Sequence, residues 1–160
     1  MVANAGVSSP QVPLADVTDE AFERVLAGNT KATFLVLREA ARRVADGGRI
    51  IVIGSSTTAH PAAGFSAYPA SKATALMLTP ILAAEVAGRG VTVNMVSAGP
   101  TDTGLLDSFP AEAKAALAKA GPFGRLGTAE DCADVVAVLA GDGARWLSGQ
   151  VLVANGAVSV

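Results

Sequence analysis

Short apolar runs alternate with longer amphipathic segments along this chain. Four short apolar runs predict strands: 1–4, 49–55, 91–97 and 149–156. The run at 49–55 shows no polar alternation, as expected for a strand that is covered on both faces. The segments between these runs predict helices: 19–46, 67–87, 110–120 and 128–141. Strands that alternate with helices in this way are typical of an α/β fold with a parallel sheet.

Local signals mark the ends of two of these helices. Thr18 can cap the first helix, and Gly47 with Gly48 can stop it. Thr128 and Asp131 have the spacing of a capping box, in which an N-cap hydroxyl and the side chain three residues later satisfy each other's backbone N–H groups. These signals predict well-defined starts for both helices.

The composition favours one compact domain and excludes several classes of protein. The chain has 160 residues, of which 51% are hydrophobic and 16% charged, and its net charge is −2. No basic patch indicates a nucleic acid partner, and no apolar run is long enough to indicate a membrane. One cysteine and one histidine provide neither an internal disulfide nor a metal site. The start of the chain lacks the pattern of a secretory signal, so we expect a reducing, cytoplasmic location.

Polar and glycine residues follow the predicted strands where a parallel sheet binds its ligands. They are Asn4, Ala5 and Gly6 after the first strand, Ser55 at the end of the second, and Gly99, Pro100 and Thr101 after the third. Tyr68 and Lys72 begin the helix that follows the second strand. Ligands of open parallel sheets bind beyond the carboxyl ends of the strands. The sequence therefore predicts one site at that edge.

Tyr68 is the only tyrosine, and Lys72 lies one helical turn after it. Side chains at this spacing share a helix face. A cation roughly 5 Å from a phenol, at an effective dielectric near 20, favours the phenolate by about 3 kcal/mol, or about 2 pK units. This would bring the phenol pKa toward the range of a general acid or base. By itself the pair also fits an ordinary surface Tyr–Lys contact.

Five sequence motifs, which occur in order along the chain, surround or accompany the Tyr68–Lys72 pair. Ser55 precedes Tyr68 by 13 residues within "IIVIGSS…AYPASK", and "ANAG" stands at 3–6. The other motifs are "FERVLAGNTKATF", "VTVNMVSAGPTDT" and the carboxyl-terminal stretch from "FGRLG" onward. Together they resemble the short-chain dehydrogenase/reductase family over essentially the whole chain. The resemblance implies part of a doubly wound, Rossmann-type parallel sheet, namely strands 4-5-6-7 of the family fold with flanking helices.

The resemblance also implies an NAD(P)-dependent oxidoreductase with four catalytic residues. Tyr68 would exchange a proton with the oxygen of a small-molecule carbonyl or alcohol substrate, and Ser55 would hydrogen-bond that oxygen. Lys72 would lower the pKa of Tyr68 and hold the nicotinamide ribose, and Asn29 would hold a water in the proton relay. Ser56, Thr57 and Thr58 also offer hydroxyls near Ser55, but the spacing to Tyr68 favours Ser55.

The cofactor is expected to be NADP or NAD, with NADP favoured. The residues that the resemblance assigns to it are Asn4, Ala5, Gly6, Tyr68, Lys72, Gly99, Pro100, Thr101 and Thr103. In the loop after the third strand, Ala98 takes the place of the usual proline and Pro100 follows the glycine, so that turn is expected to be less rigid. Enoyl reductases of the family space these two residues more widely, so the resemblance implies reduction of C=O rather than of C=C.

The chain departs from the family at its start, because it has no glycine-rich phosphate turn. We therefore expect residues 1–160 to be the catalytic part of a single domain. A truncated reading frame, a fragment and a natural short form stay open as explanations. Alone, the chain is expected to bind nicotinamide cofactor weakly or not at all, and to aggregate or pair its edge strand with another chain. The alternatives to an oxidoreductase are a non-catalytic remnant or assembly subunit and an isomerase.

The apolar residues of the predicted helix 67–87 exceed what one sheet face needs. Leu76, Leu78, Ile81 and Leu82 are expected to point outward, which predicts a homo-oligomer, either a dimer or a tetramer.

Three further residues have structural interpretations. His60 is predicted to be an exposed loop residue, and Cys132 to belong to the apolar core. Trp146 is predicted to serve packing or an interface.

Overall fold

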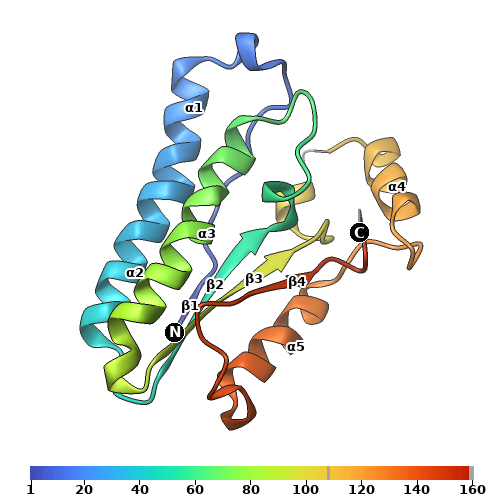
Figure 1. The fold of residues 1–160 in the computed structure, drawn as a ribbon. Coiled ribbons are helices and arrows are strands. Elements are labelled where there is room, and N and C mark those ends of the chain that lie inside the picture. Colours follow the sequence, from blue (N-terminus) through green and yellow to red (C-terminus); the bar gives the residue numbers. More distant parts are fainter. Residues whose placement is uncertain (108, 159–160) are drawn as a thin grey trace.

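Four parallel strands form a single sheet with the order β1-β2-β3-β4 in this computed structural model, which describes residues 1–107 and 109–158. The strands are β1 (Val2–Ala3), β2 (Arg49–Ser55), β3 (Thr92–Ala98) and β4 (Val151–Ala154). β2 and β3 pair along their whole length, from Arg49 opposite Thr92 to Ser55 opposite Ala98. The predicted α/β fold with a parallel sheet is therefore confirmed (Figure 1).

Helices cover both faces of the sheet (Figure 1). On one face lie α1 (Asp19–Val25), α2 (Ala32–Arg43) and α3 (Ala67–Val86), and on the other lies α5 (Ala129–Ala140). The remaining helix, α4 (Ala111–Ala120), lies beyond the carboxyl ends of the strands. The capping box at the start of α5 is confirmed: the Asp131 N–H donates to the Thr128 hydroxyl, and the Asp131 carboxylate accepts from the Thr128 N–H.

Successive side chains of β2 enter two different apolar cores. Ile50 and Val52 pack with residues of α2, α3 and β3, including Met95. Ile51 packs on the opposite face with Val96 of β3 and with Leu139 of α5. A strand with both faces buried has no need of polar alternation, which explains why the run at 49–55 is apolar throughout.

The helix predicted as one piece over 19–46 is divided in the structure. Leu26–Lys31 forms a π-helical segment between α1 and α2, and the helical backbone ends at Arg43. Gly28 sits in this segment, and a Cβ there would lie 2.7 Å from a methyl carbon of Val7. The wider turn of a π segment shifts the helix face, and such segments are frequent at functional sites. Hydrophobic periodicity cannot show it, because the residues on either side keep a helical pattern.

The prediction that four apolar residues of α3 point outward is wrong for three of them. Leu82 is buried, and Leu76 and Leu78 are partly buried against the core of α2, α3 and β2. Only Ile81 of the four is largely exposed, and Met77 joins it on the surface. The π segment and the close packing of α2 on α3 account for this, since they cover more of α3 than a sheet face would.

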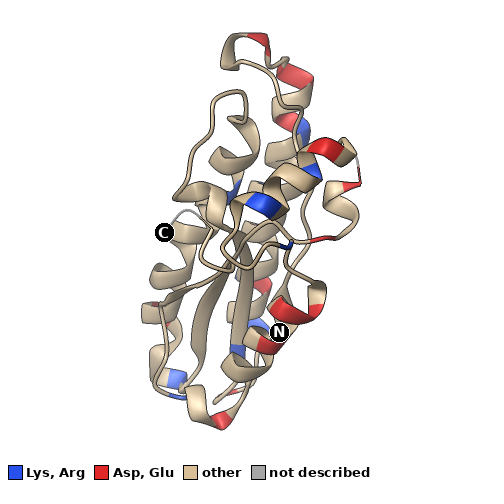
Figure 2. Cartoon of the chain, turned by 90° about the vertical axis from the view of Figure 1, so that its right-hand side faces the viewer, with Lys and Arg blue, Asp and Glu red and all other residues tan. Residues whose placement is uncertain are grey.

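Charged residues of both signs lie on the helices and loops in the side view of Figure 2. One helix in the described part of the chain, Ala67–Arg89, is long and apolar enough to cross a membrane by length and composition alone. Core helices of globular proteins meet the same criterion. This one packs on β2 and β3 and buries Tyr68 and Lys72.

Gly54 makes room for a core side chain. A Cβ at this position would lie 1.7 Å from the terminal carbon of Met95, so the methionine occupies the space above the glycine. Met95 itself is completely buried.

Gly54→Ala is therefore expected to lower the free energy of unfolding by about 1–3 kcal/mol, the usual effect of overpacking a core. Denaturant titration followed by circular dichroism measures this change. Gly143→Ala is the matched control, because a Cβ there meets no atom within 4 Å. In the double variant Gly54→Ala with Met95→Ala, the loss of unfolding free energy should be smaller than the sum of the losses in the two single variants, because the shortened side chain no longer clashes with the new Cβ. A fully additive double variant would contradict the packing described here.

Candidate active site

A cleft of about 980 Å³ opens at the carboxyl edge of the sheet. Its walls contain every residue predicted for the site except Asn29: Asn4, Ala5, Gly6, Ser55, Tyr68, Lys72, Gly99, Pro100, Thr101 and Thr103. They come from the ends of β1, β2 and β3 and from the start of α3. The expectation that these segments meet at one edge is thus met by the fold.

Tyr68 lies in the wall of the cleft with only 6% of its surface exposed. Its ring stacks on Phe65, with 5.3 Å between the ring centroids and an interplanar angle of 19°. Burial raises the pKa of the phenol, and a hydrogen bond with Ser55 offsets part of that rise. The Ser55 hydroxyl also lies 2.9 Å from the Thr57 hydroxyl. The phenol therefore stays protonated well above neutral pH and can act as a proton donor.

Lys72 is as deeply buried as Tyr68, with 6% of its surface exposed. Its Nζ donates to the carbonyl oxygen of Ile53 at 3.3 Å and lies 5.9 Å from the centroid of the Tyr68 ring. Burial lowers the pKa of Lys72, since taking an ammonium from water disfavours the charged form.

The prediction that the pKa of Tyr68 is lowered is therefore wrong: burial raises it. The prediction placed a fully charged ammonium beside a solvated phenol. In the structure both groups are desolvated, and burial is the largest influence on the pKa of each.

Asn29 lies just behind the cleft and joins three segments of the chain. Its Oδ1 accepts from the N–H of Val7 at 2.8 Å, and its Nδ2 donates to the carbonyl of Val7 at 2.9 Å and to the hydroxyl of Ser71 at 2.8 Å. Ser71 in turn donates to the carbonyl of Tyr68 at 2.7 Å. Because both N–H bonds of the amide are used, Asn29 fixes the turn after β1 against the start of α3. Its predicted role in holding a water stays a prediction.

Gly6 allows that turn to approach the lysine. A Cβ on Gly6 would lie 3.0 Å from Nζ of Lys72 and 3.1 Å from Oδ1 of Asn29. Any larger residue would push against both polar groups. The glycine of the "ANAG" turn is thus required by close packing on Lys72 and Asn29.

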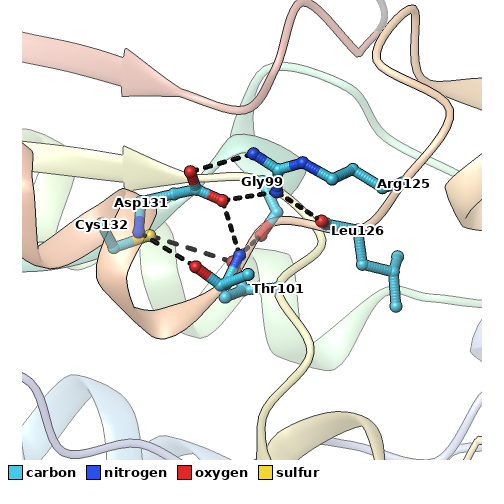
Figure 3. Close-up of polar contacts among 7 residues, drawn as sticks. Gly99, Thr101, Arg125, Leu126, Asp131 and Cys132 are labelled. Atoms are coloured by element: carbon cyan, nitrogen blue, oxygen red, sulfur yellow. Dashed lines mark hydrogen bonds and ion pairs between the residues drawn. The ribbon is translucent and has the colours of Figure 1, made fainter.

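The loop after β3 is held from two sides. The N–H of Gly99 donates to the carbonyl of Ala154, and a Cβ on Gly99 would lie 2.6 Å from Cα of Asn155. On the other side, Thr101 forms an isolated parallel bridge with Gly127. The Thr101 hydroxyl donates to the carbonyl of Gly99 at 3.0 Å (Figure 3). Despite the alanine in place of the usual proline, the turn has defined partners along its length.

The interpretations of three other residues can now be compared with the structure. Cys132 is half-buried rather than part of a core: it lines the cleft, with Sγ 3.9 Å from the Thr101 hydroxyl (Figure 3). The apolar face of its helix meets the cleft wall at this point, which the periodicity could not distinguish from a core. His60 is exposed as predicted, at the rim of the cleft. Trp146 is 95% exposed, which excludes a packing role within the chain.

Sequence analysis missed Ser71 and Phe65 as parts of the site. Ser71 shares the inward face of α3 with Tyr68 and Lys72, and its i+3 spacing from Tyr68 is the signal that could have identified it. The contact of Phe65 with Tyr68 depends on the path of a loop, for which the sequence carries no comparable pattern. Among the described residues, no group of three or more His, Cys, Asp or Glu side chains could hold a metal ion.

Comparisons with known proteins agree with the motifs. A family model described as enoyl-(acyl carrier protein) reductase matches residues 1–159. A chloroplastic NADPH-dependent aldehyde reductase-like protein of Arabidopsis thaliana is 42% identical, with 98% of this chain and 59% of that protein covered. A short-chain type dehydrogenase/reductase of Picea abies is 45% identical with the same coverage.

Solved structures give the same result for the fold. The crystal structure of the angucycline C-6 ketoreductase LanV with bound NADP superposes with a TM-score of 0.89 at 34% identity, covering 97% of this chain and 60% of that one. The chain thus spans 59–60% of the length of these three proteins.

The single tyrosine allows a direct test of the electrostatics. Because burial raises the pKa of Tyr68, tyrosinate absorbance of the folded chain should titrate with a midpoint above the ordinary phenol value of about 10. Ser55→Ala should raise the midpoint further, since it removes the hydrogen bond that lowers it. The folded state binds this proton more tightly than the unfolded state, so stability should fall as the pH rises past 10.

Circular dichroism during the titration shows whether the chain is still folded, and the chain in denaturant provides the reference midpoint. A midpoint at or below that reference would show that a cation, rather than burial, dominates the environment of Tyr68.

Proposed function

Because the chain belongs to the short-chain dehydrogenase/reductase family, we propose that it takes part in the NADP(H)-dependent interconversion of a carbonyl and a secondary alcohol. The observation that supports this most strongly is the burial of Ser55, Tyr68 and Lys72 side by side in one cleft. In this proposal residues 1–160 are the catalytic part of a single domain. A cytoplasmic location stays our prediction.

The proton chemistry follows from the three side chains. A substrate oxygen bound near the phenol accepts a hydrogen bond from the Ser55 hydroxyl, which stabilises the negative charge that develops on it. Tyr68 donates its proton to that oxygen in the direction of reduction and accepts one in the direction of oxidation. A phenol with a raised pKa is protonated at neutral pH and can serve as the proton donor in reduction.

The cofactor fits the part of the cleft formed by the turn after β1 and the loop after β3. Asn4, Ala5 and Gly6 expose backbone there, and Gly6 has no side chain between the cleft and Lys72. Among the described residues, Nζ of Lys72 has one acceptor, the carbonyl of Ile53, so further N–H bonds are available to a ribose hydroxyl. The nicotinamide would supply or accept the hydride. NADP is favoured over NAD because relatives are named for NADPH or were solved with NADP.

The cleft wall favours an uncharged substrate. Among the described residues that line it, Lys72 is the only one of type Asp, Glu, Lys or Arg. Phe65, Leu106, Phe109 and Leu117 contribute apolar surface beyond Tyr68. A substrate carboxylate or phosphate would find no second cation, so we propose a neutral carbonyl compound with an apolar body. Enoyl reductases of the family space the tyrosine and lysine more widely than Tyr68 and Lys72, so we propose a C=O group, although the matching family model is described by C=C chemistry.

Tyr68→Phe is expected to reduce turnover by about 10²–10⁴-fold, because it removes the proton donor. The cofactor affinity should change little, since Lys72 and the backbone of the turn remain. The measurement is the loss of NADPH absorbance with a neutral aldehyde or ketone, in a preparation of the protein that has turnover. NMR titration with NADPH reports binding separately.

Ser55→Ala and Ser56→Ala form a matched pair of controls, because each removes one hydroxyl from adjacent positions. Ser55→Ala should lose far more turnover than Ser56→Ala. Near-normal turnover in Tyr68→Phe would contradict the assignment of Tyr68 as the proton donor. Absence of both an NADPH response and turnover in every wild-type preparation would favour the non-catalytic alternative.

We also propose that the protein self-associates through α2 and α3. These helices lie side by side, and their outer surfaces carry Phe34, Met77 and Ile81, which are 46%, 62% and 48% exposed. Met77 and Ile81 are one helical turn apart and share a face. Removal of such apolar surface from water favours association.

Sedimentation at micromolar concentration should find at least a dimer. Ile81→Glu should shift the protein toward monomer, because it places a charge in the contact. Leu14→Glu is the control, since Leu14 is 76% exposed and lies outside both helices. A wild-type monomer, or an equal effect of both substitutions, would contradict this interface.

A further inference from the structure

The loop that carries Thr101 depends on Gly127 for its shape. The N–H of Gly127 donates to the carbonyl of Pro100 at 2.9 Å, and the N–H of Asp102 donates to the carbonyl of Gly127 at 2.8 Å. Both backbone groups of Gly127 are thus used to hold the two residues that flank Thr101. A Cβ on Gly127 would lie 3.4 Å from the Thr101 hydroxyl oxygen, so the two segments are in contact. Whatever fixes Gly127 therefore fixes Thr101.

An ion pair spans the residues on either side of Gly127 (Figure 3). Arg125 binds Asp131 with both terminal nitrogens, at 2.6 Å and 3.0 Å. Arg125 also donates to the carbonyl of Leu126 at 2.9 Å, and Asp131 accepts from the N–H of Thr128 at 2.7 Å. The pair thus holds Leu126, which precedes Gly127, and Thr128, which follows it.

The pair is charged and well defined, although it lies at the surface. The guanidinium of Arg125 and, after it, the N–H of Thr128 hold the pKa of Asp131 far below its usual range. The carboxylate also lies in the first turn of α5, where the helix dipole favours a negative charge. Both side chains are about half exposed, and exposed ion pairs contribute little to global stability. Their contacts instead hold one short connector, residues 126–128.

We propose that Arg125 and Asp131 are positioning residues that hold the Thr101 loop in place for the nicotinamide cofactor, acting through Gly127. The inference rests on the proposed function for its ligand and on the described hydrogen bonds for its geometry. Neither residue lines the cleft. Gly127 links them to it through two backbone hydrogen bonds, which makes the amides of Asp102 and Gly127 the place to measure the effect.

Hydrogen exchange of the amides of Asp102 and Gly127 in the 160-residue chain tests the positioning directly. Asp131→Asn and Arg125→Gln should each speed exchange at both amides, roughly fivefold, because the connector loses its support. Removing a carboxylate and removing a guanidinium change the local field in opposite directions. Faster exchange in both variants therefore reports the loss of the contact and not the field.

Glu39→Gln is the matched control. Glu39 forms a comparable exposed ion pair with Arg42 and Arg43 on α2, away from the loop. Glu39→Gln should leave the exchange rates of both amides unchanged. The midpoint of thermal unfolding should shift by a similar small amount in Glu39→Gln, Asp131→Asn and Arg125→Gln. Arg125→Lys keeps the charge but loses the two-pronged geometry, and it should behave like Arg125→Gln.

The ligand arm uses NADPH, and also reduced nicotinamide mononucleotide, which lacks the adenosine half. Asp131→Asn and Arg125→Gln should weaken binding of both probes several-fold in NMR titrations. In a preparation with turnover they should raise the KM for NADPH more than they lower kcat, because Tyr68 and Ser55 are untouched.

Unchanged exchange at both amides would overturn the proposal, and so would faster exchange with unchanged affinity for both probes. Failure of the proposed function has a different signature: neither an NADPH response nor turnover in any wild-type preparation, or full turnover in Tyr68→Phe. In the first case the ligand part of the proposal falls with that function, and the exchange arm still decides whether the pair supports the loop.

Discussion

The central strands β2 and β3 are buried on both faces, and the rest of the molecule is arranged around that burial. Ile50 and Val52 need α2 and α3 on one side, while Ile51 and Val96 need α5 on the other. Parallel strands also bring their carboxyl ends to one edge, where the backbone must leave the sheet. The cleft lies at that edge because the helices cover both faces and leave the strand ends open.

Asn29 and Ser71 at this edge are buried, so their polar groups must find partners. Asn29 satisfies the backbone of Val7 with both ends of its amide and reaches Ser71, which reaches the carbonyl of Tyr68. One connected set of hydrogen bonds thus ties the turn after β1 to the helix that carries the phenol. Asn29 lies in the π segment Leu26–Lys31, and Gly28 makes room for Val7 within that segment.

Burial also decides the electrostatics of the site. An ammonium and a phenol in water would stabilise each other's charged forms, but desolvation disfavours both charges here. Desolvation therefore raises the pKa of Tyr68 and lowers the pKa of Lys72, and the phenol lies next to the Ser55 hydroxyl. The surface pair of Arg125 and Asp131 shows the opposite case, in which exposure and direct hydrogen bonds keep both groups ionised.

The sequence alone determined the order and type of the main elements, because strand runs and helical segments differ in length and period over many residues. The i+4 spacing also placed Tyr68 and Lys72 on one helix face, and the resemblance of the motifs to the family implied that Ser55 belongs with them. The capping box of Thr128 and Asp131 was likewise predictable from local spacing. The tertiary structure decided what depends on contacts between distant segments: the π segment at Asn29, the buried state of Leu82, the place of Cys132 in the cleft, and the direction of the Tyr68 pKa. Each of these depends on which atoms from elsewhere in the chain remove a group from water, and no local pattern of residues carries that information.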